Sequence, residues 1–194
     1  MKTFQILAPI FLLSFVPSAA FAVDGTITFN GQLVDSTCTP TVIGGSTPGA
    51  KGADATVTLP TLNVSALPAA DTTGGLTKFG ISLNGGAGTT NGCILGSDTS
   101  KTATPYFEPE AGKVNDAGRL KNTDEQTKKV VDIQLLTDQQ RVINLSKDKA
   151  DQESPTAKLD GNNYVYNYFA RYYATDKTVA GKVTASVSYS IIYK

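Results

Sequence analysis

The chain has 194 residues, which is enough for one domain with a hydrophobic core of its own. Its 17 basic and 17 acidic residues balance, which argues against a basic nucleic-acid-binding face and against electrostatic docking on anionic membranes. The sequence contains no histidine, so Ser-His-Asp and Cys-His catalysis and imidazole metal ligands are excluded.

The first 22 residues have the three parts of a secretory signal peptide. Lys2 supplies the positive start, residues 4–16 form a short apolar stretch, and Ala20 and Ala22 supply small residues around the expected cleavage point. The apolar stretch is too short to span a bilayer, which favours cleavage over a membrane anchor. We therefore expect an exported chain of residues 23–194.

Residues 23–34 show a strand pattern with a period of two. One face is small or apolar and consists of Gly25, Ile27, Phe29, Gly31 and Leu33. Polar residues alternate with them, so the pattern by itself predicts the first strand of a β-sandwich with one buried face.

Cys38 and Cys93 are the two cysteines of the sequence. In an exported chain such a pair predicts one disulfide, which would stabilise the fold by ~4 kcal/mol in the chain-entropy model. A metal site is the alternative. It is disfavoured because no histidine completes a zinc set and the cysteines are far apart in sequence.

The middle of the chain alternates short apolar runs with turn residues, which predicts an all-β fold. Strands are expected at 56–59, 76–83, 104–107, 130–137 and 141–145, with loops at 39–55, 68–75, 84–92, 111–129 and 146–161, and either a strand or one helical turn at 62–67. The Gly-rich residues 84–92 lack the Gly-Lys-Ser/Thr ending of a phosphate-binding loop, so a surface insertion is predicted there.

Residues 163–175, N-Y-V-Y-N-Y-F-A-R-Y-Y-A-T, form the densest aromatic stretch. An aromatic stripe could bind sugars or stack on nucleobases. In a chain with so many strand patterns, however, aromatic residues on a strand are more often core and cross-strand pairs. We predict a strand with its aromatic side chains in the core.

The last fourteen residues repeat the period of two up to the end of the sequence. Every odd position is small or apolar: Gly181, Val183, Ala185, Val187, Tyr189, Ile191 and Tyr193. The even positions are polar apart from Ile192. This pattern predicts a strand with one face in a core and one face outward.

The chain resembles the pilin subunits of the chaperone–usher pathway. The resemblance rests on the two alternating ends, the cysteine pair and the short motifs A-R-Y-Y-A-T, V-T-L-P and Y-F-E-P. The similarity is to major shaft subunits of type 1 or type 3-like fimbriae. It implies an incomplete immunoglobulin-like β-sandwich that is completed by donor-strand complementation. The implied division is a signal peptide at 1–22, a donor strand at 23–34 and a pilin domain at 35–194. The Gly-rich insertion before Cys93 departs from the family and leaves the strand boundary there open.

The resemblance also assigns roles to the two ends of the chain. The small and apolar face of residues 23–34 would fill the groove of a neighbouring subunit, with Gly31 where the neighbour's core leaves no room for a side chain. The odd positions from Gly181 to Tyr193, together with Lys194, would border the groove and contact a chaperone. The implied partners are further copies of the chain, a periplasmic chaperone, an outer-membrane usher and other fimbrial subunits, with a host receptor left open and no nucleic acid.

The implied function is that of a structural subunit of a surface fimbria, exported through the periplasm, that polymerises by donor-strand exchange and supports adhesion. A minor adaptor or a glycan-binding fimbrial subunit is the alternative. A pure tip adhesin is disfavoured, since it would carry an extra lectin domain and no donor strand. An enzyme is disfavoured because no catalytic constellation stands out, and no cofactor or metal is expected.

Overall fold

The computed structural model describes residues 38–44, 54–84, 103–161 and 163–193. They belong to one compact unit of residues 34–194, which its internal contacts separate from residues 1–33. The described part contains seven strands and one short 3-10 helix, so the predicted all-β class is confirmed. None of its helices is long and apolar enough to cross a membrane.

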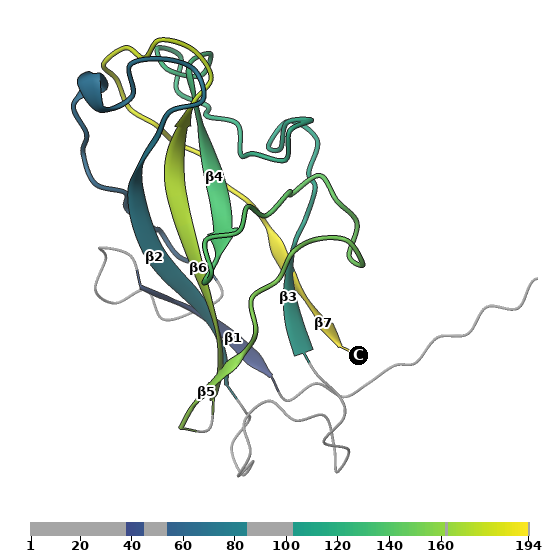
Figure 1. Ribbon diagram of the computed structural model, residues 1–194. Coiled ribbons are helices and arrows are strands. Elements are labelled where there is room, and N and C mark those ends of the chain that lie inside the picture. The colour runs from purple at the N-terminus through teal and green to yellow at the C-terminus, as the bar shows by residue number, and fades with distance from the viewer. Residues whose placement is uncertain (1–37, 45–53, 85–102, 162, 194) are drawn as a thin grey trace, which may run out of the picture. The chain divides into compact units, whose positions relative to one another are not determined.

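The larger of two sheets has five strands, in the order β1-β2-β6-β4 with β5 also beside β6 (Figure 1). Its strands are β1 (Thr39–Gly44), β2 (Thr73–Asn84), β4 (Val131–Thr137), β5 (Lys158–Asp160) and β6 (Asn163–Ala174). Every pair is antiparallel. The long central pair, β2 with β6, places Phe79 opposite Tyr168 and Ile81 opposite Tyr166.

The smaller sheet pairs β3 (Ala103–Phe107) with β7 (Tyr189–Tyr193), again antiparallel. Figure 1 shows β3 and β7 as a separate ribbon pair beside the larger sheet. Side chains of both sheets belong to one hydrophobic cluster, so the two sheets form the layers of a sandwich.

Tyr168 of β6 links the two layers. Its side chain is 1% exposed, stacks on Phe79 with ring centroids 5.3 Å apart, and meets Phe107 of β3 edge to face at 5.2 Å. Such aromatic pairs add stability beyond the burial of their area. The prediction that the aromatic stretch packs in the core is confirmed for Tyr166 and Tyr168, both of which are buried.

Strands β2, β3, β4 and β6 confirm four of the predicted strands. The 3-10 helix η1 (Val64–Ala66) confirms the helical-turn alternative, and it begins after Asn63, whose side chain accepts a hydrogen bond from the Ser65 N–H. Two strands lie in segments predicted as loops. β1 lies in the predicted loop 39–55 and β5 in the predicted loop 146–161, and both are ordered by pairing with a longer neighbour rather than by an apolar pattern of their own.

Two predicted strands were wrong, and a third was predicted too long. Residues 56–59 belong to no strand. Residues 141–145 make one isolated bridge, Val142 with Leu136, and Leu145 N–H then donates to the Gly118 carbonyl oxygen. The predicted strand over 181–193 is a strand only at Tyr189–Tyr193, where β3 supplies a partner.

Cys38, at the start of β1, is half-buried and disulfide-bonded. Cys93 lies outside the described residues, so the Cys38–Cys93 pairing stays a prediction. The signal peptide, the donor residues Gly25 to Leu33, Lys194 and residues 85–92 of the Gly-rich insertion also lie outside the described residues.

Candidate functional site: an apolar groove between two rims

Two segments border a cavity of about 860 Å³, one that belongs to no strand and one that runs into β7. Residues 54–59 form one border, here called the N-terminal rim, and residues 183–191 form the other, the C-terminal rim. Between them the cavity is lined by core side chains of the sandwich: Phe79, Ile81, Phe107, Leu120, Ile133, Leu135, Ala170 and Tyr172. The groove therefore opens directly onto the hydrophobic core.

The C-terminal rim keeps the alternation that its sequence predicts. The cavity-lining odd positions Val183, Ala185, Val187, Tyr189 and Ile191 are half-buried and pack against the core. The even positions from 182 to 190 are exposed. Apolar side chains that face a core and yet are only half-buried indicate a layer that the described residues do not complete.

The remaining predicted groove residues are placed differently. Gly181 lines a second cavity of about 650 Å³, which adjoins the first and shares Tyr172, Val183 and Thr184 with it. Tyr193 packs against the core cluster without lining either cavity. Lys194 lies outside the described residues.

In the N-terminal rim, too, the odd positions 57 and 59 are half-buried and the even positions are exposed. Val57 and Leu59 are half-buried and pack against the core, whereas Thr56, Thr58 and Pro60 are exposed. The sequence T-V-T-L predicted an ordinary short strand at residues 56–59. It did not predict that these residues border the groove, because nothing in the sequence pairs them with residues 183–191.

Backbone contacts fix the direction in which the C-terminal rim can pair. Thr184 accepts a hydrogen bond from Thr123 N–H at 2.8 Å, and Ser188 accepts one from Glu108 N–H at 2.9 Å. In a strand, the N–H and C=O of neighbouring residues point to opposite sides. The backbone groups of Val183, Ala185 and Val187 therefore point the other way, away from Thr123 and Glu108.

The groove is mostly apolar and its tyrosines stay neutral at physiological pH. Burial raises the pKa of Tyr172, and burial together with the nearby Asp54 carboxylate raises the pKa of Tyr189. Among the described residues no group of His, Cys, Asp and Glu side chains is arranged to hold a metal. An apolar groove with such borders can bury the apolar side chains of an extended segment and pair with its backbone, which would extend a sheet.

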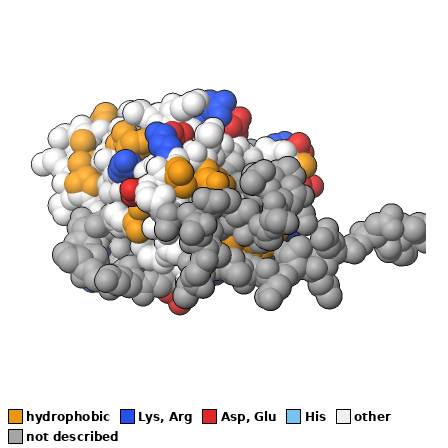
Figure 2. Space-filling model, turned by 90° about the horizontal axis from the view of Figure 1, so that it is seen from below, with side chains coloured by type: hydrophobic (Ala, Val, Ile, Leu, Met, Phe, Trp, Pro, Cys, Tyr) orange, Lys and Arg blue, Asp and Glu red, His pale blue; other side chains and the backbone are white. Residues whose placement is uncertain are grey.

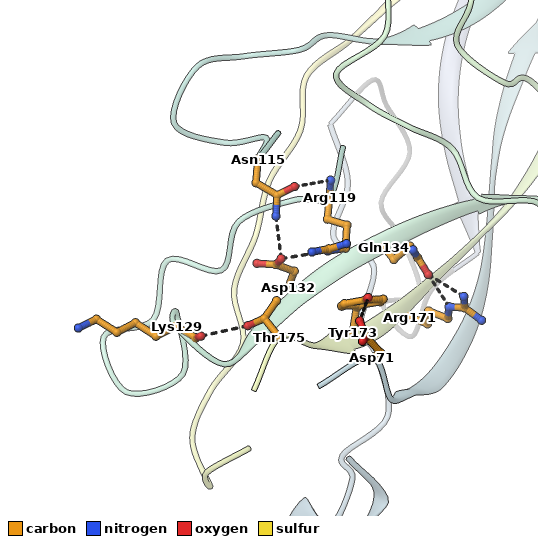
Figure 3. Close-up of polar contacts among 9 residues, drawn as sticks. All are labelled: Asp71, Asn115, Arg119, Lys129, Asp132, Gln134, Arg171, Tyr173 and Thr175. Atoms are coloured by element: carbon orange, nitrogen blue, oxygen red, sulfur yellow. Dashed lines mark hydrogen bonds and ion pairs between the residues drawn. The ribbon is translucent and has the colours of Figure 1, made fainter. Parts of the chain in front are cut away.

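A polar network lies on the opposite face of the larger sheet (Figure 3). Asp132, 6% exposed, accepts hydrogen bonds from Asn115 Nδ2 at 2.7 Å and from Arg119 Nε at 3.1 Å. Arg171 binds the Gln134 side-chain oxygen through two nitrogens, at 2.8 and 2.6 Å. These contacts provide hydrogen-bond partners for the buried Asp132 and Gln134 side chains of β4, and we interpret the network as structural.

Other exposed hydrophobic residues are scattered. Figure 2 shows hydrophobic side chains in separate patches between charged and uncharged polar regions on the face that it presents. Val64 and Val179, which are 43% and 50% exposed, line the second cavity beside Gly181. Single exposed apolar residues are normal on protein surfaces, so the groove remains the candidate site.

Comparison with known proteins decides the family. The family described as "Type-1 fimbrial protein, A" matches residues 59–194, which include the whole C-terminal rim and, of the N-terminal rim, Leu59 alone. The chain belongs to the type-1 fimbrial protein family. The resemblance inferred from the two chain ends and the cysteine pair is therefore confirmed.

Two relatives match this fimbrial protein along nearly its whole length. It is 36% identical to the F17 fimbrial protein of Escherichia coli over 179 residues, 91% of each chain. It is 37% identical over 188 residues to the major fimbrial subunit SMF-1 of Stenotrophomonas maltophilia, covering 94% of this chain and 99% of the relative.

Solved structures of pilus subunits share the fold of this fimbrial protein. A crystal structure of the P pilus rod subunit PapA matches with a TM-score of 0.53 at 18% identity, over 87% of this chain and all of PapA. A chaperone–usher pilus structure matches with a TM-score of 0.56 at 19% identity, over 94% of this chain and all of that chain. These likenesses confirm the predicted immunoglobulin-like pilin sandwich.

Proposed function

We propose that this protein is a structural subunit of a surface fimbria and that each copy accepts a strand from another copy in its groove. The observation that carries the proposal is the C-terminal rim, whose alternate apolar side chains are half-buried beside a cavity lined by the core itself. Relatives named as a fimbrial protein and a major fimbrial subunit support the shaft role over a minor adaptor.

Residues 23–34 are the proposed donor strand. Ile27, Phe29 and Leu33 repeat the period of two found at the C-terminal rim, so successive apolar side chains can enter the groove from one face. Their burial would contribute roughly 5–9 kcal/mol. Backbone pairing with the rims would add to this, as in other cases of strand addition.

Donation at one end and acceptance at the other generates a filament, because head-to-tail contacts of this kind do not close. Before assembly, the open groove and its unpaired edges need cover to prevent aggregation. A periplasmic chaperone would supply that cover and an outer-membrane usher would be the place of exchange. A Cys38–Cys93 disulfide would tie the beginning of the domain to the insertion after β2.

The experiment compares the full chain with a chain that lacks residues 23–33, both expressed in a fimbriating cell. Unboiled surface extracts of the full chain should give a ladder of SDS-resistant multimers, and those of the deletion should not. As a matched pair, Ile27, Phe29 and Leu33 are replaced together by serine, and Thr26, Thr28 and Gln32 likewise. Only the first set should abolish the ladder.

A ladder from the deletion would contradict the proposal, as would monomers from every chain. In the second case residues 23–34 are an ordinary first strand, and the protein is a secreted β-sandwich binding module.

A further inference from the structure

The outer edge of the C-terminal rim is held by a loop, not by a strand. Residues 182–184 lie beside residues 122–127, and two polar side chains of that loop are buried at the contact. Asn122 is 4% exposed and Thr127 is 1% exposed. Polar side chains are seldom buried this deeply unless hydrogen bonds satisfy them.

Asn122 and Thr127 form hydrogen bonds to the rim, to each other and to Asp124 of their own loop, whose N–H donates to Asn122 Oδ1 at 3.1 Å and whose Oδ1 lies 3.4 Å from Thr127 Oγ1. Asn122 Oδ1 accepts from the Thr184 N–H at 2.9 Å, and Asn122 Nδ2 donates to Thr127 Oγ1 at 2.7 Å. The Thr127 hydroxyl donates to the Lys182 carbonyl oxygen. Together with Thr123, whose N–H and hydroxyl donate to the Thr184 carbonyl oxygen at 2.8 and 3.1 Å, the two side chains take the place of the ladder that β3 provides farther along, at Tyr189–Tyr193.

The same loop explains the glycine at position 181. A Cβ atom there would lie 2.7 Å from Thr127 Cγ2 and 3.2 Å from Gln126 Oε1. Since the first distance is shorter than any ordinary contact, a side chain at Gly181 would push the rim and the loop apart. The glycine is therefore required by the close approach of Thr127.

We propose that Asn122 and Thr127 are positioning residues that set the place of the C-terminal rim, and that Gly181 is glycine so that Thr127 can close onto it. The inference rests on the proposed function, in which the rim pairs with a donated strand. Paired strands lie about 4.8 Å apart. A rim that moves outward by a fraction of that spacing can no longer bond an incoming strand along its length.

The first test uses Thr127→Val, which keeps the shape of the side chain and removes the hydroxyl. The matched control is Thr137→Val. Thr137 is fully buried too, but its hydroxyl accepts from Arg141 N–H at 3.2 Å at the end of β4, and it lines neither cavity. Each chain, residues 23–194, is unfolded and then refolded with a dye-labelled synthetic peptide of residues 23–34, and uptake is followed by fluorescence anisotropy.

We expect both substitutions to lower the free energy of unfolding, because each removes a buried hydrogen-bonding group. Only Thr127→Val should slow peptide uptake, by about tenfold, with Thr137→Val within about twofold of the parent chain. Each chain keeps its own N-terminal segment as a competitor, so this competition cancels between variants.

The second test is a rescue. Gly181→Ala should slow peptide uptake because the new Cβ meets Thr127 Cγ2. Thr127→Ser keeps the hydroxyl and removes that methyl group, so the double variant should take up peptide within about twofold of Thr127→Ser alone. Thr137→Ser, combined with Gly181→Ala, should give no rescue.

Two results would overturn the positioning role while leaving the proposed function intact. One is equal uptake by Thr127→Val and Thr137→Val, and the other is a Gly181→Ala defect that Thr127→Ser does not relieve. Failure of the parent chain to take up any peptide would instead overturn the proposed function, and the role of Asn122 and Thr127 with it.

Discussion

Two neighbouring core tyrosines differ in one hydrogen bond. The Tyr166 hydroxyl donates to the Ala103 carbonyl oxygen at 2.6 Å and ties β6 to β3. The Tyr168 hydroxyl is buried and makes no hydrogen bond of good geometry, although Ser154 is near enough to favour its ionised form slightly. In both residues burial is the main cause that raises the pKa of the phenol.

This difference predicts different costs for removing each hydroxyl. Tyr166→Phe should lower the free energy of unfolding by about 1–3 kcal/mol, because it leaves a buried carbonyl without its partner. Tyr168→Phe should change it by less than about 0.5 kcal/mol, since no bond is lost while the ring contacts with Phe79 and Phe107 stay. Urea unfolding of the refolded chains measures both, and equal losses would contradict the assignment.

At the scale of elements, the alternation of the C-terminal rim predicts that a charge is tolerated at an exposed even position and not at a half-buried odd one. Val187 is half-buried and packs against the core, while its neighbour Ser186 is exposed. Val187→Asp would place an unpaired carboxylate where a donated strand must exclude water, which costs several kcal/mol. We expect this variant to lose SDS-resistant multimers, and Ser186→Asp to keep them.

Cellular levels of both subunits, measured on boiled gels, separate failed assembly from failed folding. Loss of multimers from both variants at equal subunit levels would mean that the rim is sensitive to charge on either face, and would contradict the prediction.

How much of the fold could be predicted depended on whether an element carries its own pattern. β2, β4 and β6 could be predicted because their apolar residues enter the core in unbroken runs or strict alternation. β1 and β5 could not, since the T-V-I of β1 is followed directly by the Gly-rich residues 44–52 and K-L-D is too short to show a pattern, and both segments pair with a longer neighbour. Strand propensity depends strongly on such context.

The rims show the opposite case. Residues 56–59 and 181–188 have clear alternation and yet form no strand in this chain. A period of two in the sequence indicates which side chains are buried, but a strand forms only where the backbone also has a hydrogen-bonding partner. The sequence could therefore predict the groove side of residues 183–191, and under the proposed function a strand from another copy would supply the missing ladder.

The loop that holds the rim was beyond prediction. N-T-D-E-Q-T at residues 122–127 has the composition of a solvated surface turn, and residues 111–129 were predicted as a loop. Burial of Asn122 and Thr127 arises only because residues 182–184 return to this loop after some 55 residues of intervening chain, as the Thr127–Lys182 contact shows. Contacts between such distant segments leave no local pattern.

At the scale of the whole molecule, the proposed donor strand and the C-terminal rim lie toward opposite ends of one chain, so a change of connection should convert a polymer into a monomer. We predict this for a chain in which residues 23–34 are removed from the N-terminus and joined after Lys194 by a short Gly/Ser linker. The moved strand would fill the groove of its own subunit. Size-exclusion chromatography should give a monomer, and the free energy of unfolding should exceed that of the refolded parent chain.

The shortest linker that gives a stable monomer indicates whether the donated strand runs antiparallel or parallel to residues 183–191. An antiparallel strand would begin beside the end of β7, so a linker of about four residues can form a hairpin turn. A parallel strand would have to begin beside residue 183, and its linker would have to cross back over the rim, which takes about a dozen residues or more. We expect the four-residue linker to give the stable monomer, because antiparallel pairing is slightly more stable per residue.

Serine in place of Ile27, Phe29 and Leu33 in the moved strand is the control, and it should remove the gain in stability while leaving the linker unchanged. A monomer that forms only with the long linker would mean that the strand enters parallel to residues 183–191. In that case Leu33 would lie beside β7 and Ile27 beside the Gly181 cavity, and the order of the side chains along the groove would be reversed.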